Sequence, residues 1–299
     1  MNDVDGPVYQ YMTGQAQPSY AELLPGFEAR SAAVREAGLA NGTAFVDIAY
    51  ASAPRCQFDL FIAHTPASAV PSGAVLYLHA GYWQSRDKSQ FSFLAPAFNA
   101  MGQDVAIANY PLCPDVTVAN ISVVLRRAVV AVLSRLARMG RGQDRLTIIG
   151  HSAGAHLAVE LALADWDRPL LAGDSTLQAD TTLRGPACPV RAIVGLSGVY
   201  DLRPLLQTPL NDKLCLNAET ARVASPVLRV HPVGVPALFA VGTKETQAFH
   251  AQTDIMAHAW RQAGMGADTL HVSGADHFSL LDDIAGQGAL FTAIRQVVA

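Results

Sequence analysis

The 299-residue sequence has few charged residues, few cysteines, and no apolar run near the roughly 20 residues that a membrane-spanning helix needs. Charged residues make up 15% of the chain and the net charge is −4, so neither nucleic acid nor a membrane is expected as a partner. The first residues are acidic and polar, unlike a signal peptide. The four cysteines show no C-x-x-C pairing, and the histidines show no metal-ligand spacing. We therefore expect a cytoplasmic protein without a metal, a cofactor or a disulfide framework.

Hydrophobic residues, in contrast, make up 51% of the chain, which is enough for a large buried core. Short apolar runs typical of strands occur at 45–50, 58–63, 74–79, 104–110, 145–150, 190–197, 236–242 and 268–272. Helical spacing of apolar residues occurs at 117–138, 153–164, 246–263 and 279–298. Strands that alternate with helices in this way predict βαβ crossovers. We expect an α/β fold with a mostly parallel sheet of about eight strands, antiparallel at its start, and helices on both faces.

The pattern predicts one main domain with an N-terminal tail and helix and a small insertion. Residues 1–43 read as a tail and a helix that packs on the domain, which spans 44–299. Residues 165–189 form a polar connection. Residues 201–235 are broken by several prolines and are expected to form a small insertion that supplies a lid or a wall of the site.

The strongest local motif is Gly150-His151-Ser152-Ala153-Gly154, which fits G-x-S-x-G between a predicted strand and a predicted helix. A serine on such a tight turn needs small neighbours, and the two glycines supply them. The turn exposes the Ser152 hydroxyl at the carboxyl edge of the sheet, beside a helix N-terminus whose partial positive charge favours an oxyanion. Ser152 is therefore the candidate nucleophile.

A serine hydroxyl is a weak nucleophile unless a base removes its proton. With this order of elements, the base is expected after the last strand, where the sequence has His277. His271 is the alternative, but it lies within the predicted strand 268–272. We predict that His277 is the base.

The base in turn needs an acid, which is expected after the strand 236–242. Glu245 is the only acid in that loop. Asp201 is the runner-up, although it also fits the N-cap of a short helix. Asp276 adjoins the histidine in sequence and is badly placed to orient it. The predicted triad is Ser152, His277 and Glu245.

Acyl transfer also needs backbone N–H groups that stabilise the oxyanion. Ala153, the residue after the nucleophile, supplies the first. The segment "HAGYW" follows an earlier strand and supplies the second, with Gly81 as the leading donor and Tyr82 next. We expect His79 to brace this loop, and the substrate pocket to be lined by His79, Tyr82, Trp83, His151 and Phe278. The alternative for the two loop aromatics is core packing beneath the loop.

These motifs together resemble the kynurenine formamidase (arylformamidase) branch of the α/β-hydrolases, which is related to hormone-sensitive-lipase-like esterases. The family has H-G-G-x-W where this chain has "HAGYW", and shares "GHSAGAHL", a "SGVYDLRPL"-like turn and Asp-His-Phe. The likeness runs from about residue 76 to 281 and also selects Glu245 as the acid. Two positions depart: Ala80 replaces a family glycine, and Glu245 stands where animal formamidases have aspartate.

The resemblance implies a cofactor-independent serine hydrolase of the α/β-hydrolase fold that acts on a small-molecule ester or amide. Its substrate is expected to be a small-acyl ester or an aryl formamide such as N-formylkynurenine. A general short-chain carboxylesterase is the alternative within this class. A hydrolase fold kept only for ligand binding is the alternative from another class. Related proteins are often homodimers, so a homodimer is an expectation here too.

Overall fold

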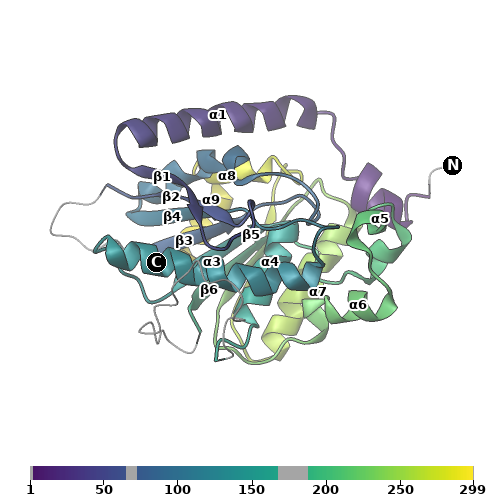
Figure 1. Ribbon diagram of the computed structural model, residues 1–299. Coiled ribbons are helices and arrows are strands. Elements are labelled where there is room, and N and C mark those ends of the chain that lie inside the picture. Colours follow the sequence, from purple (N-terminus) through teal and green to yellow (C-terminus); the bar gives the residue numbers. More distant parts are fainter. Residues whose placement is uncertain (1–2, 65–72, 168–187, 299) are drawn as a thin grey trace.

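The computed structural model describes residues 3–64, 73–167 and 188–298, and these build one eight-stranded sheet. Its order is β1-β2-β4-β3-β5-β6-β7-β8, with β1 and β2 antiparallel to their neighbours and the other strands parallel (Figure 1). The strands are β1 (Ala44–Ala49), β2 (Gln57–Phe61), β3 (Gly73–Leu78), β4 (Gln103–Ala108), β5 (Leu146–His151), β6 (Val190–Leu196), β7 (Ala237–Gly242) and β8 (Ala267–Val272). The predicted fold class is confirmed, including the antiparallel start.

Helices cover both faces of the sheet. They are α1 (Tyr20–Ala40), α2 (Ala95–Asn99), α3 (Val118–Arg138), α4 (Ala153–Ala162), α5 (Asn211–Leu214), α6 (Ala218–Val223), α7 (Gln247–Gln262), α8 (Leu280–Ala285) and α9 (Ala289–Val298). Side chains from α3, α4 and α7 build the core on one face, and side chains from α1, α2, α8 and α9 build it on the other. No helix in the described part of the chain is long and apolar enough to cross a membrane.

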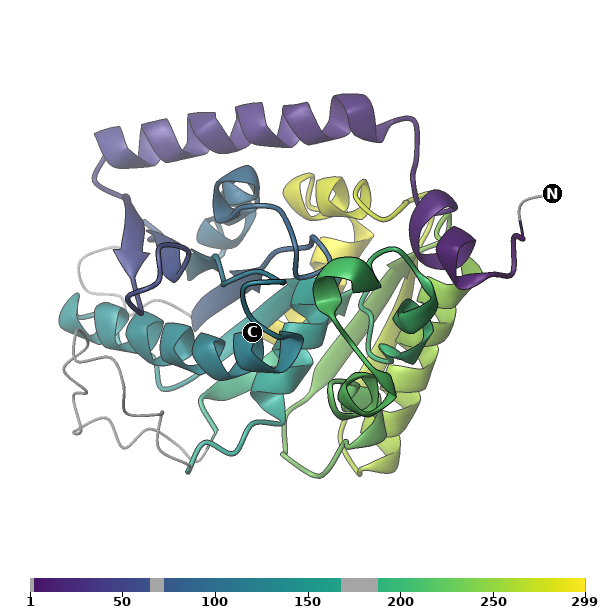
Figure 2. The same ribbon diagram turned by 45° about the vertical axis from the view of Figure 1, so that its right-hand side comes forward.

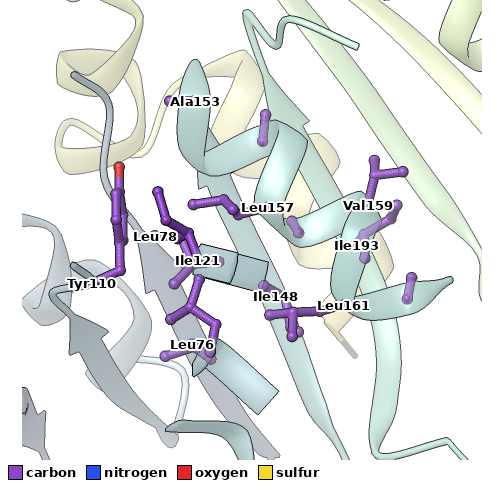
Figure 3. Close-up of a cluster of buried hydrophobic side chains, with 14 of the residues drawn as sticks. Leu76, Leu78, Tyr110, Ile121, Ile148, Ala153, Leu157, Val159, Leu161 and Ile193 are labelled. Carbon is purple, nitrogen blue, oxygen red and sulfur yellow. The ribbon is translucent and has the colours of Figure 1, made fainter. Parts of the chain in front are cut away.

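The core beneath α4 fixes the centre of the sheet. Leu76 and Leu78 of β3, Ile148 of β5 and Leu157 of α4 are fully buried and point toward one another (Figure 3). Close packing of this kind leaves little freedom for the strand ends. The carboxyl edges of β3 and β5 therefore form a rigid base for the loops that follow them.

The C-terminal stretch 279–298 differs from the single helix that its apolar spacing predicts, because it forms the two helices α8 and α9. Gln287 lies between them at φ 59°, in the left-handed region that ends a helix. The Asp283 side chain accepts hydrogen bonds from the N–H groups of Leu290 (2.7 Å) and Phe291 (3.3 Å), which satisfies donors at the start of α9.

Residues 201–235 form short helical pieces that lie beside α7 (Figures 1 and 2). Besides α5 and α6 these are the 3-10 turns η4 (Arg203–Gln207) and η5 (Pro226–Leu228). Leu205 and Leu214 are buried, so this insertion is packed onto the domain. Most of the predicted connection 165–189 lies outside the described residues.

Helix α1 is held to the domain partly by a buried group of charges. Arg35 of α1 and Lys88 both contact the carboxylate of Asp59, which is fully buried in β2. Lys88 Nζ lies 2.8 Å from Asp59 Oδ1, and the Asp47 N–H donates to the same oxygen at 2.9 Å. Buried charges require such partners because their removal from water is costly.

Replacing Asp59 with Asn should lower the free energy of unfolding by about 3 kcal/mol, because buried Lys88 would lose its buried carboxylate partner and keep the exposed carboxylate of Asp47. Urea unfolding of the purified variant measures this loss. Arg222→Ala is the control, since it breaks an exposed ion pair with Glu219 and should leave the midpoint unchanged. Equal midpoints for Asp59→Asn and the wild type would contradict the stabilising role of this group.

Candidate active site

Ser152 lies at the sharp turn where β5 ends and α4 begins. Its backbone adopts φ 56° and ψ −115°, a strained conformation for a non-glycine residue. A Cβ atom on Gly150 would lie 2.0 Å from the Gly154 oxygen, and one on Gly154 would lie 2.0 Å from the Leu78 oxygen. Both positions therefore require glycine, as the motif predicts. The Ser152 N–H donates to the Leu196 oxygen at 2.8 Å, which holds the turn against the end of β6.

His277 and Glu245 come from two loops at the same edge of the sheet. His277 follows β8, Glu245 follows β7, and His277 Nδ1 lies 2.8 Å from Glu245 Oε2. The His151 ring lies 4.8 Å from the His277 ring, and His151 Nε2 lies 2.7 Å from the His277 backbone oxygen. Since His151 directly precedes Ser152, these contacts hold the histidine loop next to the serine. The predicted base and acid are thus in direct contact, and the loop of the base lies against the residue that precedes the predicted nucleophile.

The Glu245 carboxylate is almost fully buried and accepts four hydrogen bonds. Oε1 accepts from the Ser197 hydroxyl and from the Gly242 N–H at 2.8 Å. Oε2 accepts from His277 and from Gln15 Nε2 at 2.9 Å. Burial alone would raise the pKa of Glu245, but the nearby His277 and these donors outweigh it and lower the pKa below its ordinary value. Glu245 is therefore held as a carboxylate.

Two of these donors were not predicted from the sequence. Ser197 directly follows β6, so its place at the carboxyl edge of a strand was a usable signal. Gln15 lies 230 residues before Glu245 in a tail that carries no motif.

The loop after β3 presents free backbone donors. Gly81 has φ 127° and Tyr82 has φ 50°, and a Cβ atom on Gly81 would lie 2.3 Å from the Ser85 oxygen. The N–H groups of Gly81, Tyr82 and Ala153 donate to no described residue. Ala80 has a negative φ, so the conformation that demands glycine falls on Gly81 instead. The loop and the start of α4 can therefore supply the donors that an oxyanion requires.

His79 lies beneath this loop and is fully buried. Its Nδ1 lies 2.7 Å from the Ala80 oxygen, and its ring stacks on Tyr110 at 4.4 Å. Burial lowers the pKa of His79 to about 4, so the ring is neutral at neutral pH. These contacts brace the loop, while the full burial of the ring keeps it away from solvent.

Of the other residues expected to line the pocket, Trp83 and His151 are fully buried, while Tyr82 and Phe278 keep some exposed surface. Trp83 is fully buried and packs edge-on against His156 at 5.0 Å, which is core packing beneath the loop. Tyr82 is partly exposed, and its hydroxyl donates to the Tyr11 oxygen. Phe278 is 8% exposed and its ring lies 5.2 Å from His277. His151 is fully buried, and this burial lowers its pKa well below the ordinary value.

The alternative acids and the alternative base are engaged elsewhere. Asp201 accepts the Arg203 N–H at 3.1 Å and pairs with the same arginine's guanidinium, but the expected N-cap role is wrong, because Leu202 is the N-cap of η4. Asp276 accepts from the N–H groups after His277 and shapes that loop. His271 stacks on His250 at the exposed edge strand. Among the described residues, no group of three acids, histidines or cysteines could hold a metal ion.

A serine on a strained strand-to-helix turn, beside a buried His-Glu pair and free backbone donors, defines a serine hydrolase of the α/β-hydrolase fold. The model of the BD-FAE family matches residues 58–260. The chain belongs to the BD-FAE family.

Relatives and solved structures agree with this class. The kynurenine formamidase of Danio rerio is 28% identical over 254 residues, which cover 83% of this chain and 80% of the relative. The kynurenine formamidase of Drosophila melanogaster is 27% identical, and the match covers 82% of this chain and 74% of the relative. A crystal structure from Silicibacter sp. tm1040, described as a candidate thioesterase, has a TM-score of 0.79 at 27% identity and covers 96% of this chain and 97% of its own.

Replacing Glu245 with Gln should destabilise the protein by about 3 kcal/mol near pH 7, because an amide cannot accept all four hydrogen bonds. The lowered pKa of Glu245 means that its carboxylate stabilises the fold above its ordinary value of 4.5, and that this contribution is lost as the pH falls through the folded-state pKa. The difference in the free energy of unfolding between the variant and the wild type should therefore become smaller below pH 4.5.

Urea unfolding at a series of pH values measures this difference. Glu219→Gln is the control, because that carboxylate is exposed and pairs with the exposed Arg222. A difference for Glu245→Gln that stayed constant down to the acid unfolding region would contradict the assigned charge state.

Proposed function

We propose that this serine hydrolase cleaves small-acyl esters or aryl formamides through an acyl-enzyme on Ser152. The observation that carries the proposal is the 2.8 Å contact between His277 Nδ1 and the buried Glu245 carboxylate, beside the strained Ser152 turn. A carboxylate at Nδ1 leaves Nε2 of the neutral imidazole free to accept a proton. The geometry therefore supports His277 as the base and Glu245 as the group that orients it.

In this mechanism His277 takes the proton of the Ser152 hydroxyl while Oγ attacks the carbonyl carbon. The N–H groups of Gly81 and Ala153, with Tyr82 as a further donor, stabilise the tetrahedral oxyanion. Collapse of this intermediate breaks the bond to the alcohol or amine, which receives the proton from His277. Water, deprotonated by the same imidazole, then attacks the acyl-enzyme and releases the acid with the free serine.

The relatives named kynurenine formamidase favour a formamide, N-formylkynurenine, as the substrate. A general short-chain carboxylesterase is the second candidate, because the same serine, imidazole and backbone donors also serve the hydrolysis of an ester. We also propose a cytoplasmic location, which agrees with the lack of a disulfide bond among the four cysteines, all of which lie in the described part of the chain.

Replacing Ser152 with Ala should lower the kcat for p-nitrophenyl acetate by at least ~10⁴-fold, because the variant lacks the hydroxyl that forms the acyl-enzyme. A fluorophosphonate should label the wild type stoichiometrically and leave this variant unlabelled. Ser122→Ala, at an exposed serine on α3, is the matched control and should behave as the wild type. Unchanged turnover in Ser152→Ala would refute the mechanism, and tight ligand binding without labelling would favour a non-catalytic binding protein.

If the substrate is a formamide, kcat/KM for N-formylkynurenine should exceed that for p-nitrophenyl acetate and p-nitrophenyl butyrate. The formyl group is the smallest acyl group and needs the least room beside the Gly81 loop. Steady-state kinetics on the three substrates decides the question. Higher kcat/KM for both aryl esters would establish the carboxylesterase instead.

A further inference from the structure

The N-terminal segment, residues 9–16, packs against the active site although it lies outside the sheet. It contains one short turn of π-helix, η1 (Tyr9–Thr13), which lies near the start of α7 (Figure 2). The Gln10 Oε1 accepts the Ala248 N–H at 2.9 Å, and the Thr246 hydroxyl donates to the Gln10 backbone oxygen at 2.6 Å. The segment therefore joins the loop that carries the triad acid.

Gln15 makes the most direct contact from this segment to the triad. Its side chain is almost fully buried, and both ends of its amide are used. Nε2 donates to Glu245 Oε2 at 2.9 Å, while Oε1 accepts the N–H of Thr246, the next residue, at 2.9 Å. One planar amide thus fixes the acid side chain relative to its own backbone.

We propose that Gln15 is a positioning residue for the triad, which holds the Glu245 carboxylate in the orientation that receives His277. This inference rests on the proposed serine hydrolase function. The oxygen that accepts from Gln15 is the same Oε2 that accepts from His277 Nδ1. Gln15 therefore acts on the imidazole through the carboxylate and does not contact the substrate carbonyl.

The length of the acid explains why such a residue is needed. Glutamate has one more rotatable bond than aspartate, so its carboxylate has more orientations to lose when it is fixed. Ser197 and Gly242 hold Oε1, and without Gln15 only His277 would hold Oε2. With Oε2 held by the imidazole alone, this oxygen would move with the histidine instead of fixing its orientation.

The same segment also contacts the loop that carries the oxyanion donors. The Tyr82 hydroxyl donates to the Tyr11 backbone oxygen, and the Tyr11 hydroxyl accepts from Gln252 of α7 at 2.8 Å. The Tyr11 ring packs 5.7 Å from Phe249. The segment thus connects the acid loop to the oxyanion loop, which otherwise come from opposite sides of β5 in the sheet.

Other titratable groups surround the pair and must be considered in any test. His151 adjoins the His277 ring, and Asp276 precedes His277 in the chain. Burial raises the pKa values of Tyr20 and Tyr82, and the nearby charge of Glu245 raises them further. All four stay unchanged in variants of Gln15. Differences between those variants and the wild type therefore report on the Gln15 contact.

The decisive variants are Gln15→Leu, which removes both hydrogen bonds at similar volume, and Gln15→Glu, which adds a second carboxylate beside Glu245. Gln10→Leu is the matched control, because Gln10 ties the same segment to α7 without contact to Glu245. We expect kcat to fall about 10-fold in Gln15→Leu and further in Gln15→Glu, with KM nearly unchanged. Gln10→Leu should keep the wild-type kcat, and thermal unfolding reports whether each variant folds.

The pH profile separates positioning from structural support. Without the Gln15 donor, the Glu245 charge is less neutralised and favours the imidazolium, so the acid limb of kcat/KM should move to higher pH, most of all in Gln15→Glu. The Gln15 proposal is overturned if folded Gln15→Leu keeps the wild-type kcat and acid limb. It is equally overturned if Gln15→Leu and Gln10→Leu lose the same activity without a shift of that limb.

Proton NMR of the His277 imidazole in a Ser152→Ala background tests the same contact without turnover. The midpoint of its titration should rise in Gln15→Leu and stay fixed in Gln10→Leu. If the wild type hydrolyses no ester or formamide, the proposed function fails, while this titration still decides for or against Gln15. An unmoved midpoint would overturn the Gln15 proposal whatever the enzyme hydrolyses.

Discussion

The site depends first on a carboxylate that is kept charged inside the protein. Removing a carboxylate from water costs several kcal/mol unless donors replace the lost hydration. Glu245 receives its four donors from four separate parts of the chain: the end of β6, the end of β7, the loop after β8 and the N-terminal segment. Each part must dock correctly before the charge is tolerated, so the position of the acid and the completion of the fold are coupled.

The nucleophile is fixed by packing instead of charge. Gly154 lets the backbone of α4 approach β3, and Gly150 lets α4 approach the end of β5, so closely that no side chain fits at either position. The buried leucines of β3 and α4 hold this packing (Figure 3). The strain at Ser152 is sustained because its surroundings cannot relax. The serine turn is thus fixed by packing and the acid by hydrogen bonds. The histidine loop must fit between the two.

Features that depend on a local sequence pattern, or on the order of elements along the chain, could be predicted from the sequence. Strand and helix periods predict the eight strands, G-x-S-x-G marks the turn, and chain order selects His277 and Glu245 among several candidates. The rest depends on tertiary contacts. The burial of Trp83 depends on His156 below it, and the Gln15 contact joins residues 230 positions apart. The break between α8 and α9 could have been predicted, since glycines flank Gln287, but the apolar spacing alone does not indicate it.

The two departures from the formamidase pattern have different structural consequences. Ala80 requires no compensation, because its φ is negative and the left-handed conformation falls on Gly81. Glu245 does require compensation, because its longer arm must be fixed at both oxygens. The second oxygen is shared between His277 and Gln15, and Gln15 comes from a segment outside the sheet and outside the motifs that carry the family resemblance. Under the proposed function, the longer arm of Glu245 thus makes the N-terminal segment a support of the triad.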